Sequence, residues 1–289
     1  MKKIRNLIIF IIAFFIVSFR FLSAPPPDEN TFLHEEGLLS VHFLDVGQAD
    51  CQIILLPDCH VMMIDAGNND DDVLICDYLD SLGIEKIDYL IATHPHEDHI
   101  GAMDTVINNY DIGSVYMPDA ETDTASYRDV IKALSEKGIT PDLTEAGDVI
   151  YADDVWSAEA LAPVYYYEDL NNMSIVLRLT YKNASFLFTG DCEEESEMDI
   201  TDNVSADVLS VGHHGSSTST CDDFLERVDP MYAVISCGEN NDYGHPHWEI
   251  TEKLDENDII TYRTDKMGTI ICNTHGNGAN DYHWERSHD

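Results

Sequence analysis

Short apolar segments alternate with polar turns along the chain from Leu38 to Cys272. Segments of four to eight residues that are rich in Val, Ile, Leu and aromatics, and that end at turn residues, are typical of β-strands. Ten segments fit this description: Leu39–Leu44, Gln52–Leu56, Val61–Ile64, Tyr89–Ala92, Ser114–Met117, Ser174–Thr180, Ser185–Phe188, Asp207–Val211, Tyr232–Ser236 and Gly268–Cys272. No long polar break separates them, so we predict a single folded domain over residues 38–289.

Helices are predicted between these strands, most of them in the second half of the domain. The expected helices are Asp72–Leu82, Tyr127–Lys137, Glu193–Met198, Asp222–Val228 and Trp248–Leu254. Ser126 is expected to cap the second of them, and Gly138 to end it. Hairpin-like strands, followed by strands that alternate with helices, indicate two packed sheets covered by helices.

Residues 1–24 have a different pattern and are expected to be a targeting segment. Basic residues precede the unbroken apolar run Leu7–Val17, as in a secretory signal. The run is shorter than the ~20 residues that span a bilayer comfortably. Cleavage after residue 24 would place the bulky Leu22 where a small residue is favoured, so both a cleaved signal peptide and an N-terminal membrane anchor remain open. A proline-rich linker, 25–37, follows, and we expect the domain to be extracellular or anchored on the outer face of the cytoplasmic membrane.

The charge of the chain is strongly unbalanced, whereas its overall composition is that of a globular protein. Hydrophobic residues make up 44% of the 289 positions, but 55 acidic residues oppose only 15 Lys and Arg, for a formal net charge of −40. This argues against an extended basic face for nucleic acid and against binding to an anionic membrane surface. The seven cysteines are odd in number and form no C-x-x-C pair, which argues against a disulfide framework or a thiolate zinc site.

The strongest chemical signal is a histidine-rich run directly after an apolar strand. Residues 93–99 read THPHEDH and follow the strand that ends at Ala92. Neutral imidazoles together with a carboxylate are the ligands that Zn²⁺ and similar divalent ions prefer. Alternation along an extended chain puts His94 and His96 on one side, where they can hold one ion. Asp98 and His99, on the turn that follows, can reach a second ion.

This run resembles the signature of the metallo-β-lactamase-fold hydrolases, and three further motifs follow in the order of that family. They are IDAG with Asp65, FTGD with Asp191, and HHGS with His213 and His214. The resemblance covers about residues 38–275 and implies a four-layer αββα sandwich that binds one or two divalent ions, Zn or Mn. It also implies that Asp191 bridges the ions and that Asp65 supports the ligands from behind.

The HHGS run leaves one ligand assignment open. Neighbouring residues of an extended segment point in opposite directions, so we expect one of the two histidines to bind metal and the other to contact substrate. His213 is the first choice for the ligand, with His214 as the alternative.

Further motifs resemble the metallo-β-lactamase-like domain of ComEC-type DNA-uptake proteins. These are FLDVGQAD (residues 43–50), NNMS (residues 171–174), the HHGS run and YGHP (residues 243–246). In that group the domain is thought to degrade the DNA strand that is not transported. The sequence shows no further set of membrane spans like that of the uptake channel, so we expect the domain to act alone.

One departure from the wider family concerns the first metal position. Most members place another histidine between the HxHxDH motif and the bridging aspartate, but this sequence has none from Ile100 to Gly190. Asn171 is the candidate for the vacant position. An amide oxygen is a weaker and harder ligand than imidazole, which makes Mn²⁺ or a single tightly held ion an alternative to two Zn²⁺.

These motifs together predict an exported metal-dependent phosphodiesterase or nuclease. A divalent ion lowers the pKa of bound water towards ~7 and so supplies hydroxide. Asp98 or Asp191 is expected to orient this water and take its proton, and His245 to donate a proton or contact phosphate.

Other functions stay open because a strongly negative protein repels a polyanion over about 10 Å at moderate salt. The same fold could act on a small or zwitterionic phosphodiester, such as a phosphorylcholine ester, for which an acidic rim is suited. A hydrolase of esters, lactones or β-lactams fits the ligand set less well. A non-catalytic metal-binding module is a further alternative.

Overall fold

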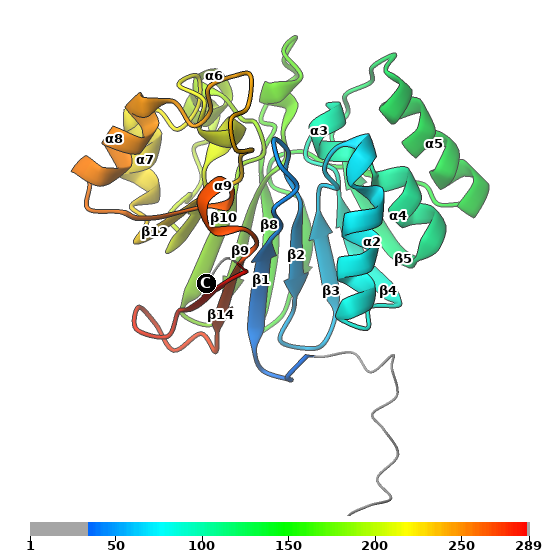
Figure 1. Cartoon of the computed structure of the whole chain (residues 1–289), viewed down its shortest axis with the longest axis horizontal. Coiled ribbons are helices and arrows are strands. Elements are labelled where there is room, and N and C mark those ends of the chain that lie inside the picture. Colours follow the sequence, from blue (N-terminus) through cyan, green and yellow to red (C-terminus); the bar gives the residue numbers. More distant parts are fainter. Residues whose placement is uncertain (1–33, 288–289) are drawn as a thin grey trace, which may run out of the picture.

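Two β-sheets pack face to face, and helices cover both outer faces (Figure 1). The computed structural model describes residues 34–287. The first sheet contains, in spatial order, β15 (His283–Arg286), β14 (Ile270–Thr274), β1 (Leu39–Phe43), β2 (Gln52–Leu55), β3 (Val61–Ile64), β4 (Lys86–Ile91), β5 (Asp111–Met117) and β6 (Asp142–Leu143). The second contains β13 (Ile260–Arg263), β12 (Tyr232–Ile235), β11 (Val208–Ser210), β10 (Ala184–Phe188), β9 (Val176–Tyr181), β8 (Trp156–Ala162) and β7 (Val149–Ala152).

Helices lie on opposite sides of this pair of sheets. The helices beside the first sheet are α2 (Asp72–Ser81), α3 (Glu97–Ile100), α4 (Met103–Asn109) and α5 (Ala125–Lys137). Those on the side of the second sheet are α6 (Glu194–Asp199), α7 (Asp222–Val228) and α8 (Trp248–Glu256), and the short α9 (Thr264–Met267) follows β13. Both sheets mix parallel and antiparallel neighbours. The predicted four-layer αββα sandwich is confirmed.

Alternation of side chains along the strands builds the apolar layers. In β2, Ile53 and Leu55 pack against the helices, whereas Ile54 packs between the sheets with Phe43 and Phe188. A third cluster, which includes Leu209 of β11 and Phe224 of α7, lies between the second sheet and its helices. Strands that are buried on both faces read as continuous apolar runs, which is why most of them could be predicted.

Five strands were missed by the sequence pattern: β6, β7, β8, β13 and β15. The clearest case is β8, WSAEALA, which pairs with β9 although alanine is a weak strand former. The start of α5 also differs from the prediction. Thr124 rather than Ser126 is the N-cap, and its side chain accepts a hydrogen bond from the Tyr127 N–H. Gly138 ends the helix in the left-handed conformation, as expected.

The predicted targeting segment, residues 1–24, and most of the linker lie outside the described residues. Within residues 34–287, no helix has both the length and the apolar character needed to cross a bilayer. All seven cysteines are free, and four of them are buried. This agrees with the absence of a disulfide framework that the odd cysteine count predicts.

Candidate metal centre

The candidate centre lies where parallel strands of both sheets end. β3 and β4 run parallel in the first sheet, and Asp65 and His94 follow their carboxyl ends. β10, β11 and β12 run parallel in the second sheet, and Asp191 follows β10. Because the carboxyl ends of parallel strands meet at one edge, this topology gathers residues that are distant in sequence. A cavity of about 620 Å³ opens there. Its lining includes seven predicted site residues: His96, Asp98, Asn171, Asp191, His213, His214 and His245.

The first half-site consists of His94, His96 and Asp191, with potential ligand atoms within 4.8 Å of one another. The Nε2 of His94 lies 2.9 Å from the Nδ1 of His96 and 3.8 Å from the Oδ2 of Asp191. Ser174 fixes the other side of the His94 ring, with its hydroxyl 3.3 Å from Nδ1. Burial, reinforced by the nearby His99, holds the pKa of His94 well below its usual value, so this imidazole is neutral and able to bind metal.

The second half-site consists of Asp98, His99, Asp191 and His214. The Nε2 of His99 lies 3.2 Å from the Oδ1 of Asp191, and the Nε2 of His214 lies 3.3 Å from Asp98. Burial opposes charge on His214, but Asp191 and Asp98 together raise its pKa to about 9. Two carboxylates in this small buried space therefore require positive charge, which protons or a divalent cation can supply. The two oxygens of Asp191 thus face different half-sites.

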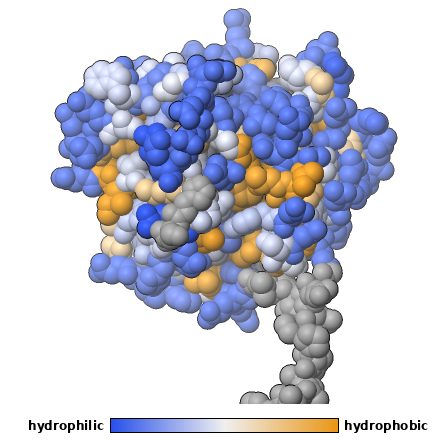
Figure 2. Space-filling view, viewed as in Figure 1, coloured by the Kyte–Doolittle hydropathy of each residue, from blue (hydrophilic) through white to orange (hydrophobic). Residues whose placement is uncertain are grey.

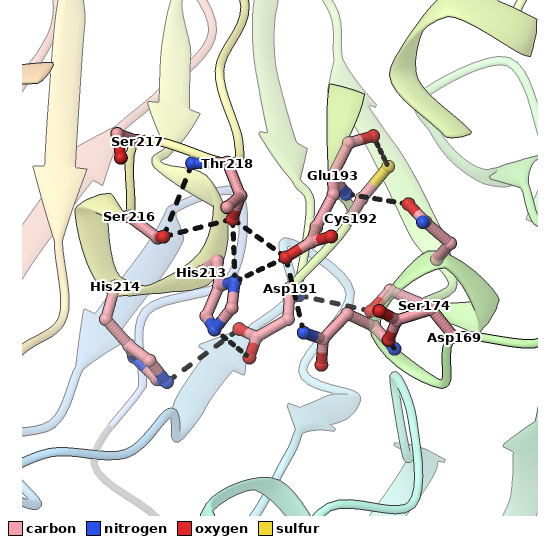
Figure 3. Close-up of polar contacts among 12 residues, drawn as sticks. Asp169, Ser174, Asp191, Cys192, Glu193, His213, His214, Ser216, Ser217 and Thr218 are labelled. Atoms are coloured by element: carbon pink, nitrogen blue, oxygen red, sulfur yellow. Dashed lines mark hydrogen bonds and ion pairs between the residues drawn. The ribbon is translucent and has the colours of Figure 1, made fainter. Parts of the chain in front are cut away.

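The backbone of the HHGS run differs from the extended form that the sequence analysis assumed. His213 and His214 lie in a short turn, η3 (Gly212–Gly215), and both have left-handed backbone angles, φ 51° and 53°. Such angles are uncommon for residues other than glycine and concentrate at functional sites. As a result both rings point to Asp191, with Nε2 atoms 3.6 and 3.7 Å from its two oxygens (Figure 3). His214 belongs to the second half-site, whereas His213 lies on the Oδ2 side, towards the first.

Asp65 lies behind the ligands, as expected. Its Oδ2 accepts hydrogen bonds from the His99 ring at 2.7 Å and from the Thr93 hydroxyl at 2.6 Å, and its Oδ1 accepts the Thr93 N–H at 2.7 Å. Because the Nδ1 of His99 donates to Asp65, its Nε2 is directed at Asp191. A carboxylate that fixes the tautomer and angle of a ligand imidazole in this way is a common support for a metal ion.

The residues present fit a divalent metal ion. Within residues 34–287, three buried polar atoms of the centre have no hydrogen-bond partner: the Nε2 of His99, the Oδ1 of Asp191 and the Oδ1 of Asn171. The Nε2 of His99 and the Oδ1 of Asp191 lie 3.2 Å apart, yet they do not form a hydrogen bond with each other. Buried polar atoms are nearly always satisfied, so this group of orphans indicates a cation. When bound, divalent ions would activate water and neutralise charge on an anionic substrate.

Glu193 is a residue of this centre that the sequence analysis missed. Its Oε1 accepts from the Thr218 hydroxyl at 2.7 Å, from the His213 ring at 3.2 Å and from the Asn171 amide at 3.5 Å (Figure 3). The Nδ1 of His213 therefore donates to Glu193, which leaves the Nε2 lone pair on the side of Asp191. The only available signal was an acidic residue two positions after Asp191.

His245 lies beside the two half-sites and is held by Gln48. The Gln48 amide lies 3.3 Å from the Nδ1 of His245 and can donate to it, which puts the ring proton of the neutral imidazole on Nε2. Burial, together with the imidazoles of His214 and His213, lowers the pKa of His245 to about 4. A neutral ring with its Nε2–H at the cavity can donate a hydrogen bond to an anionic substrate.

An αββα sandwich with a histidine and aspartate centre at the strand ends defines a class, the proteins of this fold that hold metal ions where the strands of both sheets end. The chain belongs to the metallo-β-lactamase superfamily, whose family model matches residues 44–239. The superfamily fold implies divalent metal ions, and the histidines and aspartates grouped at this centre could hold them.

The resemblance to ComEC-type proteins is confirmed by two relatives. The chain is 33% identical over 263 residues to ComE operon protein 3 of Bacillus subtilis, covering 82% of this chain and 33% of that protein. It is 28% identical over 196 residues to Competence protein ComA of Neisseria gonorrhoeae, covering 66% of this chain and 26% of that protein. The chain thus spans about a third or less of the length of these relatives.

A solved structure supports the fold. The metallo-beta-lactamase fold protein YhfI of Bacillus subtilis superimposes with a TM-score of 0.53 at 11% identity, over 78% of this chain and 95% of that one.

Proposed function

We propose that the chain is an exported phosphodiesterase that cleaves nucleic acid at this centre, with Zn²⁺ or Mn²⁺ as the metal. The observation that carries the proposal is the arrangement around Asp191. One oxygen faces His94 and His213, and the other faces His99 and His214. A centre that can hold two ions on a shared carboxylate suits displacement at phosphorus, where attacking and leaving oxygens both need stabilisation. Similarity to proteins named for competence supports a nucleic-acid substrate.

The carboxylates and His245 have different chemical roles in this proposal. When ionised, the carboxylates of Asp98 and Asp191 act only as hydrogen-bond acceptors, so they can orient an attacking water. Burial opposes the charge of Asp191, but His99 and His214 outweigh it and hold the pKa of this carboxyl well below its usual value. The Nε2–H of His245 donates to a phosphate oxygen or to the leaving group. The cavity of about 620 Å³ falls within the usual range for small-ligand sites, which is enough for a nucleotide.

Export is part of the proposal and rests on the N-terminal pattern of basic residues followed by Leu7–Val17. Protease added to intact cells should remove the protein, or culture medium should contain it. Protection inside intact cells would contradict export and leave the chemistry of the centre untouched.

One observation favours a second candidate, a small zwitterionic phosphodiester. No lysine or arginine is among the described residues that line the cavity, whereas Glu97 and Asp98 do line it. Acidic side chains at a cavity mouth can attract a cationic group such as choline, and they repel a polyanion.

The test compares both substrates on the full chain, purified in a mild detergent. Cleavage of single-stranded DNA and of p-nitrophenyl phosphorylcholine is measured with Mn²⁺ and with Zn²⁺. Asp191→Asn is the inactive variant, and Asp123→Asn, at a side chain 95% exposed, is the matched control. Metal-dependent DNA cleavage that is lost only in Asp191→Asn supports the proposal. Turnover of the choline ester alone favours the second candidate, and bound metal without either reaction contradicts both.

A further inference from the structure

The loop after β12 presents an aromatic ring at the cavity. Tyr243 lines the cavity, yet its side chain is 70% exposed. One face of its ring lies against His245, with ring planes 23° apart and centroids separated by 5.6 Å. The Tyr243 hydroxyl makes no hydrogen bond within residues 34–287. The second face of the ring is therefore available for a partner, directly beside the residue proposed to contact phosphate.

The backbone of the loop that carries this ring is held by the Asn241 side chain. The Asn241 side chain donates to the carbonyls of Gly238 and His245, at 2.9 and 2.6 Å. It also accepts from the N–H groups of Tyr243 and His245, at 3.1 and 3.0 Å. Gly244, between these two residues, has a φ of 77°, a conformation that glycine adopts without strain. A loop whose backbone is already braced needs little further ordering when a ligand packs on one of its side chains.

Charge offers little binding energy for a nucleic acid here, so another source is needed. Among the described residues, neither lysine nor arginine lines the cavity. Stacking of bases on aromatic rings stabilises single-strand binding by about 1–3 kcal/mol per base and tolerates any sequence. The stacking face of Tyr243 supplies this interaction without positive charge.

We propose that Tyr243 is the stacking platform for a nucleobase next to the scissile phosphate. This inference rests on the proposed function and adds the residue that would contact the base. A base on Tyr243 places the adjoining phosphate at His245 and the two half-sites.

Tyr166 provides the matched control. It is also an exposed tyrosine, at 75%, but it is not among the residues that line the cavity. Substitution at Tyr166 changes the surface in the same way without touching the proposed base site. Both side chains are exposed, so neither alanine variant is expected to affect folding.

The experiment measures kcat/KM of the full chain, with Mn²⁺, on two 12-residue oligonucleotides of equal charge, one of thymidines and one of abasic residues. Wild type should prefer the thymidine oligonucleotide. Tyr243→Ala should lower that preference about tenfold, mainly through KM. Tyr243→Phe and Tyr166→Ala should keep the wild-type preference. A second readout is binding of a 2-aminopurine oligonucleotide in Ca²⁺, whose fluorescence should be quenched by wild type and Tyr243→Phe but not by Tyr243→Ala.

The outcomes distinguish failure of the stacking role from failure of the proposed function. Equal preference and equal quenching in wild type and Tyr243→Ala, with DNA still cleaved, would overturn the stacking role and leave the nuclease proposal standing. Failure of wild type to cleave either oligonucleotide would overturn the proposed function and the stacking role together.

Discussion

Asp191 is the residue on which both half-sites depend, because each of its oxygens faces a different pair of imidazoles. Replacement by asparagine removes the charge and one of the two acceptor oxygens. We expect Asp191→Asn to lose most of its bound metal and more than about 100-fold of its hydrolytic rate. Metal content by mass spectrometry and cleavage kinetics measure the two effects. Wild-type metal content with full activity would contradict the site.

Asn171 is the candidate for the metal position at which most members of the family have a further histidine. Its Oδ1 is buried with no partner in the described part of the chain, and its amide N–H donates to Glu193. If Oδ1 faces the first half-site, Asn171→His should raise the zinc stoichiometry, because imidazole is the better Zn²⁺ ligand. Asn171→Ala should weaken Mn²⁺ binding by about 10-fold or more. Titration of the metal-free protein with each ion measures both, and equal affinities in all three proteins would exclude Asn171 from the metal centre.

The sequence predicted the placement of single residues well where that placement depends on a local motif. It did so less well where the backbone conformation or a distant element determines the placement. The alternation that paired His94 with His96 is a local property, and the structure brings these two residues together. The placement of His213 and His214 depends on two consecutive left-handed residues, which the sequence pattern did not indicate. Gln48 approaches His245 across 197 positions of the chain, so no local pattern could reveal it.

At the scale of elements, a buried carboxylate joins α6 to the segment that precedes α7. Glu197 of α6 is fully buried, and it accepts the backbone N–H groups of Thr220 and Cys221, the latter at 2.9 Å. It forms no ion pair within the described residues. Burial therefore dominates and raises the pKa of Glu197 to about 7 from the usual 4.5.

This raised pKa predicts how stability depends on pH. Between pH 4.5 and 7 the folded chain holds a proton on Glu197 that the unfolded chain has released, so stability falls as pH rises through this window. The loss is about 3 kcal/mol once pH exceeds 7. Glu197→Gln carries no charge, so its free energy of unfolding should fall less between pH 5 and pH 8, as measured with urea. Glu194→Gln, at an exposed residue of the same helix, should follow wild type. Parallel pH profiles for wild type and Glu197→Gln would refute this account.

Strands were predictable where burial on both faces gave an unbroken run of strand-forming apolar residues, whereas the largely buried β8 was missed because alanine is a weak strand former. Strands that are apolar on both faces, such as β2 and β3, were recognised because burial on two sides leaves no polar alternation to misread. β6 has two residues and both are exposed, so it has almost no sequence signal. β13 is exposed to intermediate along its length and contains only one aliphatic residue. Such edge strands form because a neighbour offers hydrogen bonds, which is a property of the whole sheet.

For the whole molecule, the net charge of −40 opposes the approach of a polyanion, and Figure 2 shows a largely hydrophilic face. Most nucleic-acid enzymes bind through basic residues and lose affinity as salt rises. For this protein we expect affinity for nucleic acid to rise with salt. Salt shortens the range of the repulsion between the two negative surfaces, whereas stacking on Tyr243 and contacts at the buried centre are screened much less. The value of kcat/KM on single-stranded DNA should therefore rise several-fold from about 20 to about 200 mM NaCl, and further with Mg²⁺. An uncharged methylphosphonate oligonucleotide with one central phosphodiester is the control, and its cleavage should change little. A steady fall in DNA cleavage over the same range would mean that local positive potential, supplied by bound metal at the strand ends, outweighs the charge of the whole surface.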